Sequence, residues 1–202
     1  NTALTFLSLY QNGFGGEIPE SLTKLKSLSH LDLAENDFSG EMPAFIGEMV
    51  GLYYLFLASN NFDAAPIPEE YVNLSNLREL SLKSTKRTGS IENFVNFGAL
   101  ELLDLDDNDL QGPIPEFLGA NPFMFGLLLN RNQFSGSVPA SLGNLTQLRV
   151  LFLDGNNVTG TLEPFCSLPK LVNRTIIADC KELRCPCCTL CCTDAESPCH
   201  KN

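Results

Sequence analysis

Positive charge and long apolar runs are scarce in this chain of 202 residues. It carries 13 Lys and Arg against 24 Asp and Glu, so the formal net charge is −11. This imbalance argues against nucleic acid and anionic membrane surfaces as partners. Runs of about 18 uncharged apolar residues are also missing, so we expect no segment of this chain to span a membrane. A membrane attachment would require a segment that this chain does not contain.

Cysteine is absent from the first 165 residues, and all eight cysteines lie between Cys166 and Cys199. The chain begins at Asn1-Thr2-Ala3 without an initiator methionine or a signal peptide, so we expect a mature or trimmed part of a longer product. An even number of clustered cysteines, together with four N-x-[ST] sequons, indicates a secretory route and an extracellular location. The sequons begin at Asn73, Asn144, Asn157 and Asn173.

A segment of the form L-x-x-L-x-L-x-x-N recurs along the chain. The spacing is 24 residues, with one repeat of 25 and one of 23. Most copies continue into a second signature, x-F/L-x-G-x-I-P, which is clearest at 38–43, 110–115 and 134–139. Seven copies in register indicate a repeat architecture. The copies are Leu4–Asn12, Leu28–Asn36, Leu52–Asn60, Leu77–Thr85, Leu100–Asn108, Met124–Asn132 and Leu148–Asn156.

The residue types in this repeat predict a solenoid. Alternating leucines, such as Leu31 and Leu33, point inward from a short strand, and successive coils pair their strands in parallel. The recurrent Asn bonds backbone groups of adjacent coils, and Thr85 replaces it once with half the capacity. The chain then returns in short helical or 3-10 turns. We therefore predict an α/β solenoid with a parallel concave sheet and a convex side of short turns, followed by a disulfide-rich cap.

The L-x-G-x-I-P half of the repeat resembles the plant-specific class of leucine-rich repeats, over roughly residues 4–165. The resemblance implies a right-handed superhelix with a second small strand per coil, as in plant receptor-kinase ectodomains and polygalacturonase-inhibiting proteins. Ala64-Ala65 stand near an expected Gly, and Glu92 and Glu163 occupy Pro positions. We therefore expect an imperfect second strand around residues 62–68 and 89–93.

Two domains are predicted: repeats over 1–165, starting near residues 4, 28, 52, 77, 100, 124 and 148, and a cysteine-rich cap and tail over 166–202. A solenoid end needs a cap to cover its apolar cross-section. The Ala-Asp-Cys…Cys-x-Cys-Cys-Thr-x-Cys-Cys pattern is similar to extracellular repeat proteins of diatoms and related algae. Disulfides are favoured over a metal–thiolate cluster, but eight cysteines allow 105 pairings. The cysteines are Cys166, Cys180, Cys185, Cys187, Cys188, Cys191, Cys192 and Cys199.

The N-terminal end begins directly with a full repeat at Leu4, without a paired-cysteine cap. A trimmed upstream cap is the favoured explanation. The alternative is that this end meets a co-receptor or a second copy of the chain.

Outward positions of the strands should form columns across the concave face. Aromatic and aliphatic residues gather near both ends of these columns, with carboxylates between them, and we predict that this strip binds a peptide, glycan or protein. The predicted ligand-binding residues are Phe6, Tyr10, His30, Tyr54, Phe56, Glu79, Leu102, Asp104, Asp106, Leu128 and Phe152.

A structural explanation competes with this one. Aromatic residues favour strands simply because they pack against cross-strand neighbours. The carboxylates also have lateral partners in the predicted register, Lys83 beside Asp106 and Arg131 beside Asp107, and such pairs on a solvated face contribute about 0–1 kcal/mol. For any single residue we favour the structural explanation. For the face as a whole we favour ligand binding, as the resemblance to plant receptor ectodomains implies.

Catalysis is not expected. His30 and His200 are the only histidines, and no serine or cysteine stands poised as a nucleophile beside His30 and Asp32. Asp104 and Asp106 lie on an open face, which does not suit acid–base catalysis. Calcium at Asp104, Asp106 and Asp107 is conceivable, but these residues lack an enclosing oxygen shell. No cofactor and no metal are predicted. The favoured function is an extracellular ligand-binding ectodomain; the alternatives are a secreted inhibitor of a wall-degrading enzyme and a structural adhesion or matrix protein.

Overall fold

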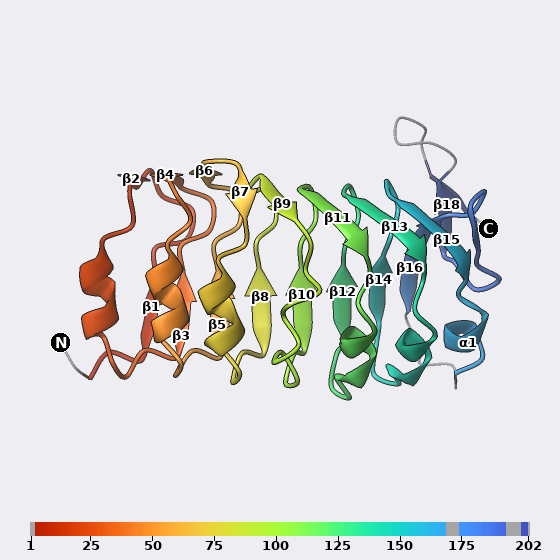
Figure 1. Cartoon of the computed structure of the whole chain (residues 1–202), viewed down its shortest axis with the longest axis horizontal. Helices are drawn as coiled ribbons and strands as arrows, with labels where there is room; N and C mark the ends of the chain where they lie inside the picture. Colours follow the sequence, from red (N-terminus) through yellow and green to blue (C-terminus); the bar gives the residue numbers. More distant parts are fainter. Residues whose placement is uncertain (1–2, 169–173, 193–198, 202) are drawn as a thin grey trace.

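The structure is a computed structural model, which describes residues 3–168, 174–192 and 199–201. Short strands stand side by side along the long axis, one in each coil, and form a ten-stranded sheet (Figure 1). All of its neighbours pair in parallel except the last pair. In order the strands are β1 (Phe6–Ser8), β3 (His30–Asp32), β5 (Tyr54–Phe56), β8 (Glu79–Ser81), β10 (Leu102–Asp104), β12 (Gly126–Leu128), β14 (Val150–Phe152), β16 (Thr175–Asp179), β18 (Leu190–Cys192) and β19 (His200–Lys201).

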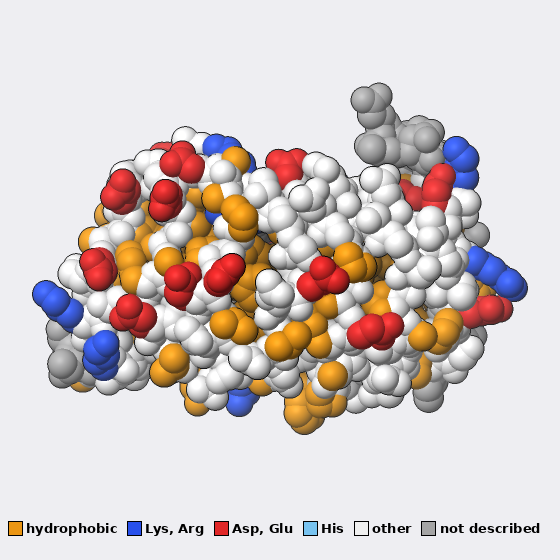
Figure 2. All heavy atoms as spheres, viewed as in Figure 1, with side chains coloured by type: hydrophobic (Ala, Val, Ile, Leu, Met, Phe, Trp, Pro, Cys, Tyr) orange, Lys and Arg blue, Asp and Glu red, His pale blue; other side chains and the backbone are white. Residues whose placement is uncertain are grey.

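Short helices lie across these strands on the viewer's side of Figure 1. Each 3-10 helix follows a proline that starts it in extended conformation, as Pro43 does before η2. Acidic side chains are spread along this helical side of the molecule (Figure 2). The helices are η1 (Glu20–Lys24), η2 (Ala44–Glu48), η3 (Glu69–Asn73), η4 (Glu116–Ala120), η5 (Ala140–Asn144) and α1 (Glu163–Cys166).

Between the sheet and the helices lies one apolar core, made by the repeat leucines of every coil. Leu31 and Leu33, for example, are almost fully buried. The predicted leucine-rich-repeat solenoid, with parallel strands and 3-10 turns, is confirmed. The described part of the chain contains no helix with the length and hydropathy of a membrane span.

The recurrent asparagine links each coil to its neighbours. Asn36 Nδ2 donates to the carbonyls of Leu9, Leu33 and Ala34, and its Oδ1 accepts from the Phe14 amide. The asparagine thereby pairs buried backbone carbonyls and an amide that lie just beyond the strands. Buried backbone groups need such partners. The same pattern recurs at Asn60, Asn108, Asn132 and Asn156.

A second layer of short parallel strands runs along another edge of the coils and is interrupted once. One part holds β2 (Gly15–Gly16), β4 (Asp37–Gly40) and β6 (Asn61–Phe62). The other holds β7 (Ala65–Pro66), β9 (Arg87–Gly89), β11 (Asp109–Pro113), β13 (Gln133–Ser137), β15 (Asn157–Thr161) and β17 (Leu183–Arg184). The interruption lies within the predicted imperfect stretch at 62–68, where the 25-residue repeat carries its extra residue.

Arg87 fills this interruption. It stands where other coils place a core Phe, such as Phe134, and it is fully buried. Its Nε donates to the Thr85 carbonyl (2.9 Å), and Nη1 and Nη2 donate to the Pro66 and Asp63 carbonyls. The guanidinium thus pairs carbonyls on both sides of the break, and burial lowers its pKa.

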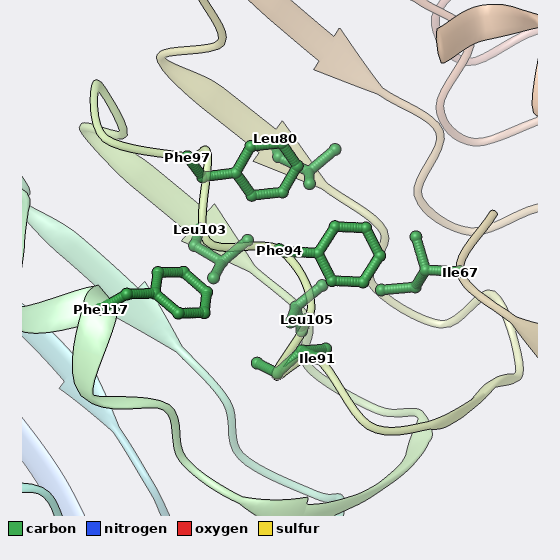
Figure 3. Close-up of a pocket in the computed structure, with 8 residues that line it drawn as sticks. All are labelled: Ile67, Leu80, Ile91, Phe94, Phe97, Leu103, Leu105 and Phe117. Atoms are coloured by element: carbon green, nitrogen blue, oxygen red, sulfur yellow. The ribbon is translucent and has the colours of Figure 1, made fainter. Parts of the chain in front are cut away.

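The coil that contains Arg87 lacks a 3-10 helix. Between β9 and β10 the chain makes turns that place Phe94 and Phe97 in the core, with ring centroids 5.5 Å apart. These rings border a void of about 10 Å³ (Figure 3). Because the void is the size of one water molecule at most and is lined only by apolar side chains, it is a packing defect rather than a ligand site. Its lining residues are Ile67, Leu80, Ile91, Phe94, Phe97, Leu103, Leu105 and Phe117.

The cysteine-rich segment continues the sheet across the predicted boundary at 165. β16 pairs with β14 in the same register as the earlier coils, β18 pairs with β16, and β19 closes the edge in antiparallel direction. All eight cysteines form disulfides. The pairs are Cys166–Cys187, Cys180–Cys191, Cys185–Cys188 and Cys192–Cys199.

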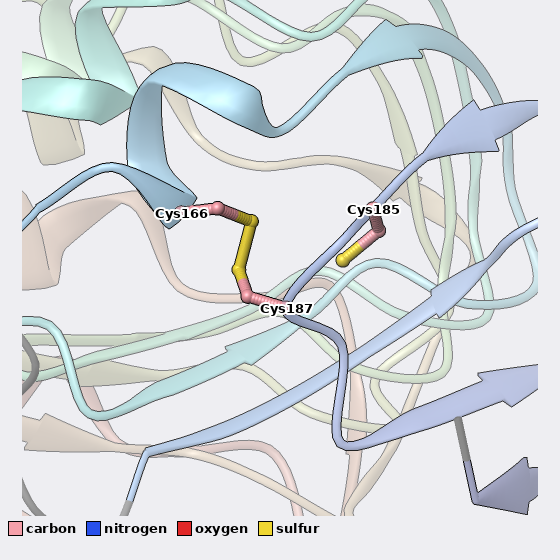
Figure 4. A group of neighbouring side chains, drawn as sticks. All are labelled: Cys166, Cys185 and Cys187. Carbon is pink, nitrogen blue, oxygen red and sulfur yellow. A yellow bond between two sulfur atoms is a disulfide. The ribbon is translucent and has the colours of Figure 1, made fainter.

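The alternative of a thiolate metal cluster is thereby disfavoured. Cys166, Cys185 and Cys187 do bring their sulfurs within 4.8 Å of one another, as a metal cluster would. Figure 4 shows, however, that Cys166 and Cys187 are bonded to each other, while Cys185 is bonded to Cys188. Sulfurs in disulfides carry no thiolate charge for a metal ion.

Candidate binding face on the ten-stranded sheet

The sheet register places the predicted site residues side by side. We call the side of the ten-stranded sheet away from the core the outer face; it is the face that the sequence predicts to be concave. Phe6 lies beside His30, and His30 beside Tyr54. Two residues further along the strands, Asp104 lies beside Leu128 and Leu128 beside Phe152. The columns are therefore as expected.

Aromatic rings near the N-terminal end form one stacked group. The Phe6 and His30 rings stack with centroids 4.2 Å apart, and His30 lies 5.3 Å from Tyr54 and 5.6 Å from Phe56. Burial lowers the pKa of His30, although Asp32 acts in the opposite direction. Phe6 remains 57% exposed. The group offers a firm apolar surface, because each ring is fixed by its neighbour.

Polar side chains border this aromatic group. The Tyr10 hydroxyl donates to Glu35 Oε1 (3.0 Å), and this hydrogen bond raises the pKa of Tyr10. Asp32 accepts hydrogen bonds from the Ser8 hydroxyl (3.2 Å) and the Ala34 amide (3.1 Å). Its carboxylate is thus held by the coil edge rather than by the imidazole of His30.

A second apolar group lies towards the C-terminal end of the outer face. Leu102, Leu128, Val150 and Phe152 are all half-buried there. Gly126 leaves room for Leu102, because a Cβ at Gly126 would approach Leu102 Cδ1 to 2.5 Å. The cap strand extends this apolar surface with Ile177, which lies beside Phe152. The sequence prediction missed Ile177, although the alternation of Ile176 and Ala178 with outward residues was a usable signal.

Between the two apolar groups lies an ion-paired carboxylate, Asp106. Its side chain is only 5% exposed, and Lys83 Nζ approaches it to 3.1 Å. Arg131 donates to it from Nε (2.8 Å) and also from Nη2. Two expectations are corrected here. Asp106 is buried rather than solvated, and Arg131 pairs with Asp106 rather than Asp107.

Asp107 keeps a partner in its own column. Asp107 and Arg131 occupy the position before the recurrent Asn, where the chain adopts a positive φ of 59° and 53°. Ser84 holds the same position in its coil with a φ of 52°, so the column itself is preserved. The Asp107 carboxylate instead accepts from the Ser84 hydroxyl (2.6 Å).

Glu79 and Asp104 are two half-buried carboxylates in the middle of the outer face, and like Asp32 and Asp154 they lack a basic partner at ion-pair distance in the described structure. Asp104 accepts from the Ser81 hydroxyl and the Asp106 amide, both at 3.1 Å. Burial raises the pKa of Asp104 despite these hydrogen bonds, and it also raises the pKa of Glu79, with Glu101 adding to the effect. Both carboxylates are therefore partly desolvated before any ligand arrives.

Replacing Asp104 with asparagine is expected to raise the free energy of unfolding at pH 7 by up to about 1 kcal/mol, with no change at pH 3. A carboxyl whose pKa is raised in the folded state binds its proton more tightly when folded, so ionisation destabilises the fold as pH rises. The amide oxygen keeps the bond from the Asp106 amide, and the amide NH2 group donates to the Ser81 hydroxyl in place of the second carboxylate oxygen. Urea unfolding of both proteins at the two pH values measures the effect. The exposed Asp107→Asn serves as control, and equal stability of Asp104→Asn and the parent at pH 7 would contradict the prediction.

Three of the four sequons lie in described positions. Asn73 ends η3 and Asn144 ends η5, both exposed and on the helical side, so glycans there leave the outer face open. Asn157 is exposed at the start of β15. Asn173 lies outside the described residues.

A family model described as Leucine Rich Repeat matches residues 3–25, 27–49 and 99–121. Together with the coil geometry and the asparagine ladder, this match decides the architecture. The chain is a leucine-rich-repeat solenoid.

Relatives of this leucine-rich-repeat solenoid include plant receptors. It is 36% identical to Pollen receptor-like kinase 2 of Arabidopsis thaliana over 107 residues, which make up 52% of this chain and 16% of that protein. The ectodomain of the Arabidopsis receptor kinase HAESA, solved with an N-terminally extended IDA peptide hormone ligand, superposes with a TM-score of 0.79 at 33% identity. That match covers 99% of this chain and 32% of HAESA.

A second HAESA structure contains the peptide hormone IDA and the co-receptor SERK1. It matches with a TM-score of 0.74 at 33% identity, over 100% of this chain and 32% of that one. The chain thus spans less than a third of these relatives' length. Like the matching receptor segments, this solenoid is an extracellular domain.

Proposed function

We propose that this solenoid is the non-catalytic ligand-binding part of a cell-surface or secreted recognition protein, and that its outer face binds an extended peptide. The observation that carries the proposal is the arrangement of that face. A stacked aromatic group at His30 and a half-buried apolar group at Phe152 flank the partly desolvated carboxylates of Glu79 and Asp104.

The size of the face fits a short extended chain. From His30 in β3 to Val150 in β14 there are five strand-to-strand steps, which at about 4.8 Å each span about 24 Å. A peptide with about 3.3 Å per residue crosses this distance with roughly seven residues. Apolar side chains near its ends would contact the two apolar groups.

The charge of the face favours a basic residue in the middle of such a peptide. Lys83 and Arg131 are already bound to Asp106, whereas Glu79 and Asp104 have no basic partner at ion-pair distance in the described structure. A Lys or Arg of the ligand would form ion pairs with these carboxylates. Peptide hormones bound to solved relatives support the peptide class, and a relative solved with its co-receptor supports a co-receptor as a further partner.

Biolayer interferometry against peptide, oligosaccharide and wall-hydrolase panels tests the proposal. We expect saturable binding of a peptide, weakened at least 10-fold in the double variant Tyr54→Ala/Phe56→Ala, because removal of central aromatic anchors typically costs 1–2 kcal/mol or more. Replacing the central Lys or Arg of the bound peptide by glutamine should weaken binding by a similar factor.

Phe123→Ala is the matched control, because Phe123 is 68% exposed and lies on neither apolar group. The Phe123→Ala variant should bind the peptide with the same affinity as the parent protein. Binding that survives the double variant would refute the outer face as the site. Saturable binding of an intact hydrolase alone would favour the inhibitor alternative, and self-association without a discrete ligand would favour the adhesion alternative.

A further inference from the structure

Three polar side chains stand in one column where the repeats meet the cap. β12, β14 and β16 pair so that Leu128, Phe152 and Ile177 lie side by side. Two residues further along each strand, the chain presents Asn130, Asp154 and Asp179 (strands in Figure 1). The same column holds Asp106 one coil before Asn130. There, Lys83 and Arg131 both form ion pairs with the carboxylate.

Two oxygens in this column lack hydrogen-bond donors. Asn130 is only 8% exposed, and its Oδ1 has no partner. Asp154 Oδ1 is likewise shielded from solvent and without a partner. A buried acceptor without a donor is costly, so two of them in adjacent coils favour an electropositive group at this position.

The charge around these oxygens is negative. Asp179 Oδ2 accepts from the Gly155 and Asn156 amides (2.8 and 3.4 Å), which holds its carboxylate in the coil next to Asp154. The guanidinium of Arg131 is the nearby base, and it is bound to Asp106. The disulfide sulfurs of Cys192 and Cys199 lie within 4.8 Å of an Asp154 carboxylate oxygen. They carry no thiolate, so the available donors are all hard oxygens.

We propose that this column is a calcium site, in which Asn130 Oδ1 and Asp154 Oδ1 bind the cation. The Asp179 carboxylate adds charge beside it, and water completes the coordination. Calcium accepts carboxylate and amide-carbonyl oxygens in irregular arrangements, and extracellular sites of this kind have Kd values of about 10⁻⁴–10⁻³ M. The ion would join the last repeats to the disulfide-bonded cap, so its occupancy stabilises that junction.

Thermal unfolding of the disulfide-intact chain in 10 mM CaCl2 and in EDTA tests the site. With the stated affinity, we expect calcium to raise the Tm by about 3–10 °C. Magnesium at the same concentration should raise it much less, because it gives up its water reluctantly. Isothermal titration calorimetry with CaCl2 should show one site per chain in the sub-millimolar to millimolar range.

Variants locate the ion. Asp154→Asn keeps the side-chain shape and Asn130→Leu removes the amide oxygen, and each should reduce the calcium-dependent shift to below about 1 °C. Asp107→Asn removes an equal charge from an exposed neighbouring position and should keep the full shift. Because each variant is compared with itself in EDTA, a general loss of stability does not mimic the result. No calcium shift in the parent, an equal shift in NaCl of matched ionic strength, or an unchanged shift in Asp154→Asn would overturn the proposal.

Discussion

Replacing Asn108 with alanine is expected to lower the free energy of unfolding by about 3–5 kcal/mol. Asn108 Nδ2 donates to the carbonyls of Leu82, Leu105 and Asp106. Its Oδ1 accepts from the amides of Thr85 and Arg87. Truncation leaves these buried backbone groups of two coils without a partner, and water cannot reach them. Urea unfolding monitored by circular dichroism measures the loss.

Asn12→Ala is the matched control. Asn12 holds the same repeat position but is exposed, and its Nδ2 donates only to Leu9 and Tyr10 within its own coil. Its loss should cost less than about 1 kcal/mol. Equal effects of the two substitutions would show that the residue type matters, and not the burial of the ladder.

Removing the Cys166–Cys187 disulfide by a double serine substitution is expected to cost about 3 kcal/mol. The bond closes a loop with a sequence separation of 21, and the chain-entropy estimate of its stabilisation grows with loop length. The bond joins α1 to the cap. Without it the unfolded chain gains conformational entropy, which lowers the free energy of unfolding. Thermal unfolding of the parent and the Cys166→Ser/Cys187→Ser variant gives the difference.

The Cys185–Cys188 bond provides the comparison. Its sequence separation is 3, and Cys185→Ser/Cys188→Ser should cost only about 1.5 kcal/mol by the same estimate. Both disulfides involve the cysteine-rich segment and are measured under the same redox conditions, so redox conditions do not account for a difference between the two stability losses. A larger loss for the short loop would show that packing of the buried Cys185 and Cys188, and not loop closure, dominates.

The sequence predicts which residues of the candidate site lie side by side, but it does not predict which charged side chains pair. Strand periodicity places Phe6, His30 and Tyr54 in one row, because side chains alternate with a period of two and the coils repeat in register. The predicted partner of Arg131 was wrong, because its long side chain reaches Asp106 in the adjacent column, whereas Asp107 accepts from Ser84. The sequence did not predict Asn130 and Asp154 as a pair, because the shielding of their side-chain oxygens depends on neighbouring coils and on the cap.

The repeat pattern alone determined the solenoid, the inward leucines, the asparagine ladder and the interruption near residue 64. These features depend on contacts that each coil repeats with the next, so local spacing encodes them. Only the tertiary structure decided the four cysteine pairs, the continuation of the sheet through β16 and β18, and the role of Arg87. These features join residues whose separation follows no period. Their geometry arises only once the coils have stacked and set which groups are buried without a partner.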